Sequence, residues 1–139
     1  MRQLEDIVAR IAKRDPLRTE ATLQADIRSF ILGARLNIVE GHIRDVQMES
    51  QLGDGSKRRI DIEAGNTVIE VKRSLNSPSV LSEAEQQLAG YLHQRTKQTD
   101  NRYIGVLTDG RQWHLYIPDP AGNRVIRAGK PFIVSGADD

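Results

Sequence analysis

Two carboxylates and a lysine lie close together in the middle of the chain, as Asp61, Glu70 and Lys72. Carboxylates on adjacent strands suit Mg²⁺, which prefers octahedral oxygen coordination with one or two carboxylates and several waters. A lysine beside them could orient or deprotonate an attacking water and neutralise charge on a phosphate as it becomes five-coordinate. These residue types indicate metal-assisted hydrolysis of a phosphate ester, with Asp61 and Glu70 as metal ligands.

The spacing of these residues predicts a β-hairpin that brings them together. Gly65-Asn66 separates two alternating runs and is a strong two-residue turn signal. In that register Asp61 faces Glu70, and alternation puts Lys72 on the same side. We expect the other, apolar side to face the core, with Ile60, Ile62, Ile69 and Val71. Opposed carboxylates repel each other, and a divalent cation would remove that cost. The alternative interpretation is a charged strand face turned to solvent.

The elements that must position this hairpin are two helices and a strand before it and a helix and several strands after it. Helical periodicity predicts helices over residues 4–11, from the N-cap Thr19 to Gly33, and from Ser77 or Ser82 to about Thr96. Alternation predicts further strands from about residue 43 to 52, over 103–107 and 113–117, and at 124–127 and 132–134. Turn signals lie at 53–56 and at Asp109-Gly110.

Length and composition are those of an ordinary globular chain, and we expect residues 1–139 to form one domain. Lysine and arginine total 20 against 19 acids, so a nucleic-acid partner would have to contact local basic patches. The candidate patches are Lys57-Arg58-Arg59, Lys72-Arg73 and Arg95 with Lys97. The chain has no cysteine, no apolar signal core and no segment apolar enough for a membrane, so we expect a cytoplasmic location.

The motif around the hairpin resembles that of a known nuclease superfamily. Asp61, eight intervening residues and Glu70-Val71-Lys72 resemble the metal-binding and catalytic signature of PD-(D/E)xK nucleases, although Ile60 stands where the signature has proline. Gln87-Leu88-Ala89-Gly90-Tyr91 resembles the QxxxY element of the branch that includes type I restriction subunits and exonuclease-type enzymes. The resemblance covers about residues 19 to 117. It implies an α/β fold with a restriction-endonuclease-like core, in which helices flank a central mixed sheet.

The resemblance also implies roles for residues outside the hairpin. Gln87 and Tyr91 would help place the scissile strand and support the catalytic site, although Tyr91 could instead be a core residue. Glu20, at the start of the second predicted helix, resembles the further acidic ligand that many of these nucleases present to the metal. Glu20 could instead only favour the positive end of its helix dipole, and Glu49 is the rival for the ligand role.

The function expected from the resemblance is that of a DNA endonuclease that depends on Mg²⁺, with Mn²⁺ able to substitute. The chain would be the cleavage module of a restriction-modification enzyme, with methyltransferase or helicase-like motor domains or subunits as partners. In that setting it would be the N-terminal module of a larger protein. The alternative is a nuclease-like fold that binds nucleic acid or a partner protein without catalysis.

Overall fold

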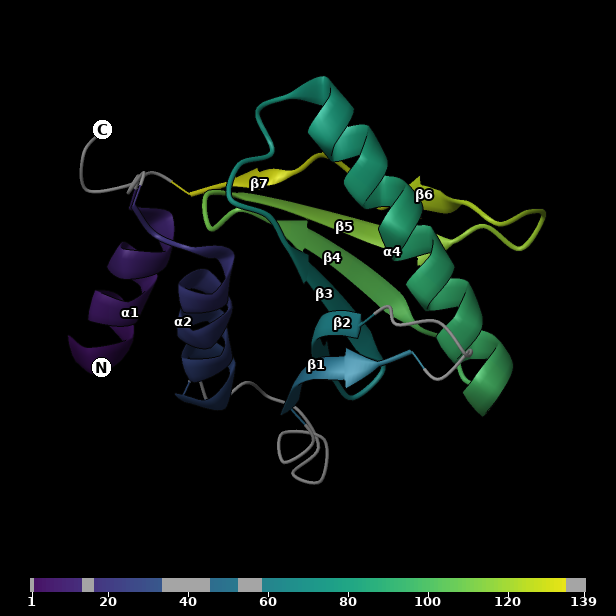
Figure 1. The fold of residues 1–139 in the computed structure, drawn as a ribbon, viewed down its shortest axis with the longest axis horizontal. Helices are drawn as coiled ribbons and strands as arrows, with labels where there is room; N and C mark the ends of the chain where they lie inside the picture. The colour runs from purple at the N-terminus through teal and green to yellow at the C-terminus, as the bar shows by residue number, and fades with distance from the viewer. Residues whose placement is uncertain (1, 14–16, 34–45, 53–58, 135–139) are drawn as a thin grey trace.

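The computed structural model describes residues 2–13, 17–33, 46–52 and 59–134, and within these ranges the chain is an α/β fold (Figure 1). Its helices are α1 (Arg2–Ala12), α2 (Glu20–Gly33) and α4 (Pro78–Thr99). Its strands are β1 (Val46–Gln51), β2 (Arg59–Ala64), β3 (Thr67–Val71), β4 (Ile104–Thr108), β5 (Gln112–Pro118), β6 (Val125–Arg127) and β7 (Phe132–Ile133). The predicted α/β class and the predicted elements in these ranges are confirmed. The turn signal at 53–56 lies outside the described residues.

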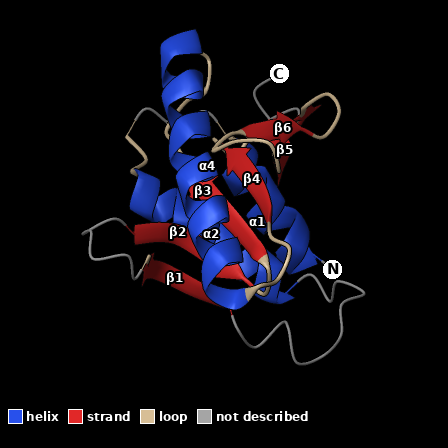
Figure 2. Cartoon of the chain, turned by 90° about the vertical axis from the view of Figure 1, so that its right-hand side faces the viewer, coloured by secondary structure: helices blue, strands red, loops and turns tan. Residues whose placement is uncertain are grey.

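All the described strands join one mixed sheet in the order β1-β2-β3-β4-β5-β6, with β7 also paired to β5. The β3–β4 pair is parallel and the other pairs are antiparallel. Parallel neighbours need a long crossover connection, and α4 supplies it between β3 and β4 (Figure 2). The hairpin that carries the candidate residues therefore lies inside the sheet, between β1 and β4.

Helices cover both faces of the hairpin part of the sheet. On one face α4 packs on a cluster of buried side chains that includes Leu52, Ile60, Val68, Leu88 and Leu107. On the other face α1 and α2 pack on a cluster that includes Ile11, Ile27, Ile62, Ile69 and Val71. Two charged side chains of these strands, Glu63 of β2 and Glu70 of β3, are consequently buried, in contrast to those of a strand face turned to solvent.

The ends of the helices follow from local chemistry. The Thr19 hydroxyl accepts the backbone N–H of Thr22 at 3.1 Å, which confirms the predicted N-cap of α2. Helix α4 starts after Ser77, with Pro78 in its first turn. It ends at Thr99 instead of Thr96, because Asp100 adopts a left-handed conformation and donates its N–H to the Thr96 carbonyl. In the part of the chain that the structure describes, no helix has the length and apolarity to cross a bilayer.

Gly110, in the turn between β4 and β5, brings α1 against the end of the sheet. Its φ is +93°, and a Cβ atom on it would lie 2.1 Å from the carbonyl oxygen of Ile11. Only glycine meets both conditions, since it tolerates positive φ and has no side chain to clash. The C-terminal end of α1 therefore rests directly on the β4–β5 turn.

Candidate active site

The predicted hairpin register is confirmed where the strands pair. Ala64 faces Thr67 and Ile62 faces Ile69. Asp61 and Glu70 follow next in the same register, just beyond the last paired residues. There the Asp61 carboxylate accepts the backbone N–H of Val71 at 2.9 Å, so a side chain takes over as hydrogen-bond partner where the ladder ends.

Glu70 is buried, with only 3% of its surface exposed. Burial is the largest cause that raises its pKa, to about 10, followed by a hydrogen bond with Asp61 and the negative charges of Asp61 and Glu20. The positive charge of Lys72 acts in the opposite direction. In the metal-free protein Glu70 therefore keeps its proton at neutral pH.

The predicted division of the hairpin into two faces is correct in its paired part and wrong at Ile60. Ile62, Ile69 and Val71 lie together in the cluster under α1 and α2. Ile60 belongs to the opposite cluster, under α4, and the left-handed residue Glu49 lies between Ser50, the β1 partner of Ile60, and Met48, the partner of Ile62. Glu70 alternates with Ile69 and Val71 along β3 and so points to the α4 side of the sheet.

Lys72 follows β3 and is held in place by the end of β4. Its backbone N–H donates to the Thr108 carbonyl at 3.0 Å. The buried Asp109 carboxylate then accepts the N–H of Leu75 at 2.8 Å and also those of Arg111 and Gln112, at 3.0 and 2.9 Å. One carboxylate thus ties the segment after Lys72 to the β4–β5 turn. The sequence showed Asp109 only as a turn residue.

Lys72 and Glu20 line the same cleft, which has a volume of about 940 Å³. Five cationic side chains line it, from four separate parts of the sequence: Lys13, Arg18, Lys72, Arg73 and Arg111. The sequence predicted only the Lys72-Arg73 patch here. The other three cations, Lys13, Arg18 and Arg111, lie far from Lys72 in the sequence, so no local pattern there indicates that they share its cleft.

Glu20 contributes to the electric field at Glu70, as its charge raises the Glu70 pKa. The rival residue Glu49 is exposed, and its left-handed φ of 56° places an unusual backbone conformation in the middle of β1, beside Asp61 in the register. Within the described ranges no three histidine or acidic side chains gather into a metal-binding group. Asp61 and Glu70 are the pair that the fold brings together, and a ligand role for Glu20 stays a prediction.

Gln87 and Tyr91 lie on the buried side of α4. Tyr91 is part of the core cluster under this helix, as its alternative interpretation expected. Gln87 comes seven residues after Val80, which lines the cleft, so both side chains lie on the same side of the helix. Its Oε1 atom is buried and has no hydrogen-bond partner among the described residues. A buried amide oxygen in this state is a candidate acceptor for a ligand or a bound water.

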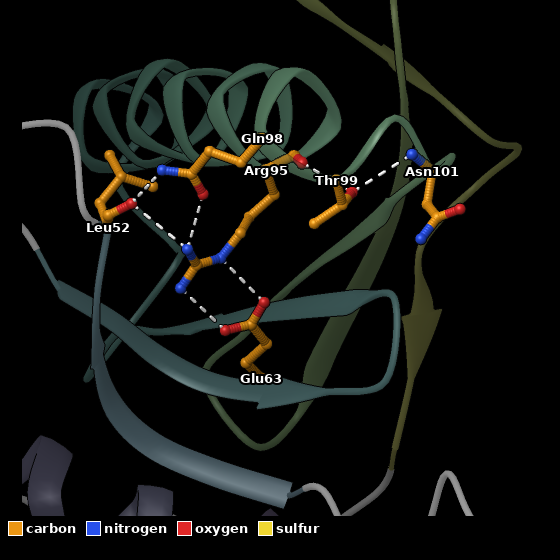
Figure 3. A network of polar contacts seen from close by, with 6 residues as sticks. All are labelled: Leu52, Glu63, Arg95, Gln98, Thr99 and Asn101. Atoms are coloured by element: carbon orange, nitrogen blue, oxygen red, sulfur yellow. Dashed lines mark hydrogen bonds and ion pairs between the residues drawn. The ribbon is translucent and has the colours of Figure 1, made fainter.

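A buried ion pair joins α4 to β2 two residues from Asp61 (Figure 3). The Arg95 guanidinium donates to both Glu63 oxygens, at 2.9 and 3.0 Å, and to the Leu52 carbonyl at 3.2 Å. Gln98 donates to the same carbonyl at 2.7 Å. Arg95 is therefore engaged inside the protein, which corrects its assignment to a DNA-contacting patch. Lys57 and Arg58 of another candidate patch lie outside the described residues.

Comparison of the chain with protein-family models, with curated proteins and with solved structures found no significant match.

Proposed function

We propose that this chain is a metal-dependent nuclease with a restriction-endonuclease-like core, which hydrolyses DNA phosphodiester bonds by activating water. The observation that carries the proposal is the buried Glu70 carboxyl group beside Asp61, with Lys72 in the lining of a basic cleft. Buried carboxylates are rare unless a partner compensates their charge. A strongly perturbed acid next to a cleft is the kind of group that marks a functional site.

The donor set fits a divalent cation. Asp61 and Glu70 offer carboxylate oxygens from neighbouring strands, and a cation between them would favour the ionised form of Glu70, which burial and the charge of Asp61 disfavour. Mg²⁺ held by this pair, or Mn²⁺ in its place, would lower the pKa of a bound water and neutralise charge on the phosphate. Glu20 is the proposed additional acid, because it lines the cleft and its charge reaches Glu70.

The residues of the chain itself would orient the reaction. The Val71 N–H holds the Asp61 carboxylate in one orientation, which fixes one ligand in advance. Lys72 would stabilise the negative charge that builds up on the phosphate and orient the attacking water. Gln87 would place the substrate strand with its unpartnered oxygen, through a bridging water, and the buried Tyr91 would support it.

The proposed setting is the cleavage module of a restriction-modification enzyme in the cytoplasm. DNA would be the substrate, and methyltransferase or helicase-like motor domains or subunits would be the partners. The cleft supports this setting, since its lining offers charge for a DNA backbone but little that could distinguish bases.

A cleavage assay on supercoiled and linear DNA tests the proposal. Wild type is incubated with Mg²⁺, with Mn²⁺ and with chelator, alongside Asp61→Asn, Glu70→Gln and Lys72→Met. The matched control is Glu83→Gln, which neutralises an exposed acid on α4. We expect metal-dependent cleavage by wild type and control, and a loss of at least about 100-fold in each site variant. Cleavage that is equal in all variants would falsify the assignment, and DNA binding without cleavage by wild type would favour the non-catalytic alternative.

A further inference from the structure

The cleft beside the candidate active site extends beyond the segment that carries the nuclease resemblance. Lys13 follows α1 and Arg18 precedes α2, and both line the same cleft as Lys72 and Arg73. On the other side the cleft is closed by the β4–β5 turn, which contributes Arg111. Five cations against the two acids Glu20 and Asp109 give the lining a net positive charge, although the chain as a whole is nearly neutral.

Packing fixes the N-terminal part of this lining. Gly110 allows the backbone of Ile11 to lie against the β4–β5 turn, so the end of α1 and Lys13 are brought to the cleft. The Arg18 guanidinium donates to the Arg10 carbonyl, close to the C-terminal end of α1. The Arg10 side chain in turn bonds to Asp26 of α2 at 3.2 Å. The two cations from the α1–α2 connection are therefore part of a built wall of the cleft.

Two helices also start at this cleft. Thr19 and Glu20 at the beginning of α2 line it, as do Asn76 and Val80 at the beginning of α4. The N-cap Ser77 of α4 makes no side-chain capping hydrogen bond. The positive ends of two helix dipoles thus add to the field of the five cations and favour an anionic ligand.

The described lining offers charge but little means to read bases. It contains no aromatic side chain on which an unpaired base could stack. Its two amide side chains are bonded to each other, since Gln112 donates to the Asn76 oxygen at 2.7 Å. The Gln112 oxygen is in turn 3.1 Å from His114 Nε2. A lining of this kind suits phosphates, which occur at the highest density along duplex DNA.

We infer that this cleft binds the phosphate backbone of duplex DNA independently of base sequence, and that Lys13 and Arg18 form its N-terminal wall. The inference rests on the proposed function and adds to it a binding surface outside the resembling segment. On this inference the affinity of the cleft for DNA comes from its positive charge, and the base sequence is selected by another domain or subunit.

Fluorescence anisotropy of metal-free protein with labelled duplexes of several unrelated sequences tests the inference. The variant is Lys13→Gln with Arg18→Gln, and the matched control is Arg28→Gln with Lys130→Gln, two exposed cations outside the cleft lining. Between about 50 and 200 mM salt, removing one cation that pairs with a phosphate should reduce the log–log salt slope by about one. For the cleft variant we expect the log–log salt slope to fall by about two and the affinity for DNA to fall about tenfold, equally for every sequence. The control should match wild type.

Further measurements distinguish a misfolded variant from a wrong binding inference and from a wrong proposed function. The charge-preserving variant Lys13→Arg with Arg18→Lys should restore the slope, which a general loss of folding would not allow. An unchanged slope in the glutamine variant overturns the inference, as does a loss confined to one sequence or tighter binding of single-stranded DNA. If wild type binds duplexes with the expected slope but never cleaves them, the proposed function fails and the binding inference stands. If wild type cleaves DNA but the glutamine variant shows an unchanged salt slope, the binding inference fails and the proposed function stands.

Discussion

The Asp61 carboxylate accepts the backbone N–H of Val71 at 2.9 Å, across the gap where the β2–β3 ladder ends. This hydrogen bond holds Asp61 beside Glu70, the residue that precedes Val71, and keeps one carboxylate oriented while the other is buried. The pair is costly for a metal-free protein, because burial and like charge both act against ionised Glu70. The stability of the protein should therefore change when either carboxyl group is replaced by an amide, when the pH changes and when a metal ion is added.

Glu70→Gln should stabilise the metal-free protein. The folded pKa of Glu70, about 10, is raised above its ordinary value of 4.5, so its contribution to stability is fully present below about pH 4.5 and is lost as pH rises toward 10. Glutamine has nearly the same shape as glutamate but does not titrate. The free energy of unfolding of the variant should therefore exceed that of wild type by about 2 kcal/mol at neutral pH and by more at about pH 9. Urea denaturation with chelator at several pH values measures the difference. Parallel pH curves for the two proteins would show that Glu70 does not carry the proton.

Asp61→Asn should abolish stabilisation by Mg²⁺. Asparagine can still accept the Val71 N–H through its side-chain oxygen, but it removes one of the two charges that would bind the cation. Without metal we expect the variant to gain about 1 kcal/mol over wild type as pH rises toward 10, because ionised Glu70 is then no longer repelled by Asp61. Calorimetric melts of both proteins with Mg²⁺ and with chelator give the complete cycle. An equal response to Mg²⁺ would mean that the two carboxylates share no cation.

Gln87→Met should separate a functional amide from a structural one. The buried Gln87 oxygen has no partner among the described residues, and a buried unsatisfied polar atom destabilises the fold. Methionine has a similar volume and no such atom, so we expect stability to be unchanged or higher by about 1 kcal/mol. DNA cleavage should nevertheless fall by about tenfold or more, since the acceptor for the substrate is gone. A large loss of stability with full activity per folded molecule would instead assign Gln87 to the core.

Gly110→Ala should destabilise the protein far more than Gly129→Ala. Both glycines have positive φ, +93° and +87°, so both substitutions strain the backbone by about 1 kcal/mol. Only at Gly110 would the added Cβ meet Ile11 backbone, at 2.1 Å, whereas nothing lies within 4 Å at Gly129. We expect an additional loss of about 2 kcal/mol or more at Gly110 from displacement of α1. Similar losses in thermal melts of both variants would show that α1 does not rest on the turn.

Arg95→Met should cost much more stability than Arg127→Met. Each arginine pairs with a glutamate, and each pair links α4 to a strand. The Arg95 and Glu63 side chains are 15% and 12% exposed, so removing Arg95 leaves a nearly buried charge without its main partner, at a cost of about 3 kcal/mol. Arg127 is 59% exposed and its loss should cost at most about 1 kcal/mol. Chemical denaturation compares the two, and Glu63→Met in the Arg95→Met background should recover part of the loss.

Local patterns in the sequence determined most of the secondary structure and the centre of the candidate site. Gly65-Asn66 between two alternating runs specifies the hairpin, and with it the placement of Asp61 next to Glu70 in register. These features depend on neighbours in the chain: turn residues select the loop, and the two-residue period sets which side chains share a face. The cap at Thr19 was readable for the same reason, because a hydroxyl bonds an N–H only three residues away.

The tertiary structure alone decided what surrounds that centre. Ile60 lies in the cluster under α4, although the two-residue period of the sequence places it on the face of Ile62. Arg95 looked like a surface cation until packing placed Glu63 against it. The cleft wall formed by Lys13 and Arg18 exists because α1 rests on Gly110, about a hundred residues away in the chain. Contacts between distant segments depend on how whole elements pack, and no local run of residues encodes them.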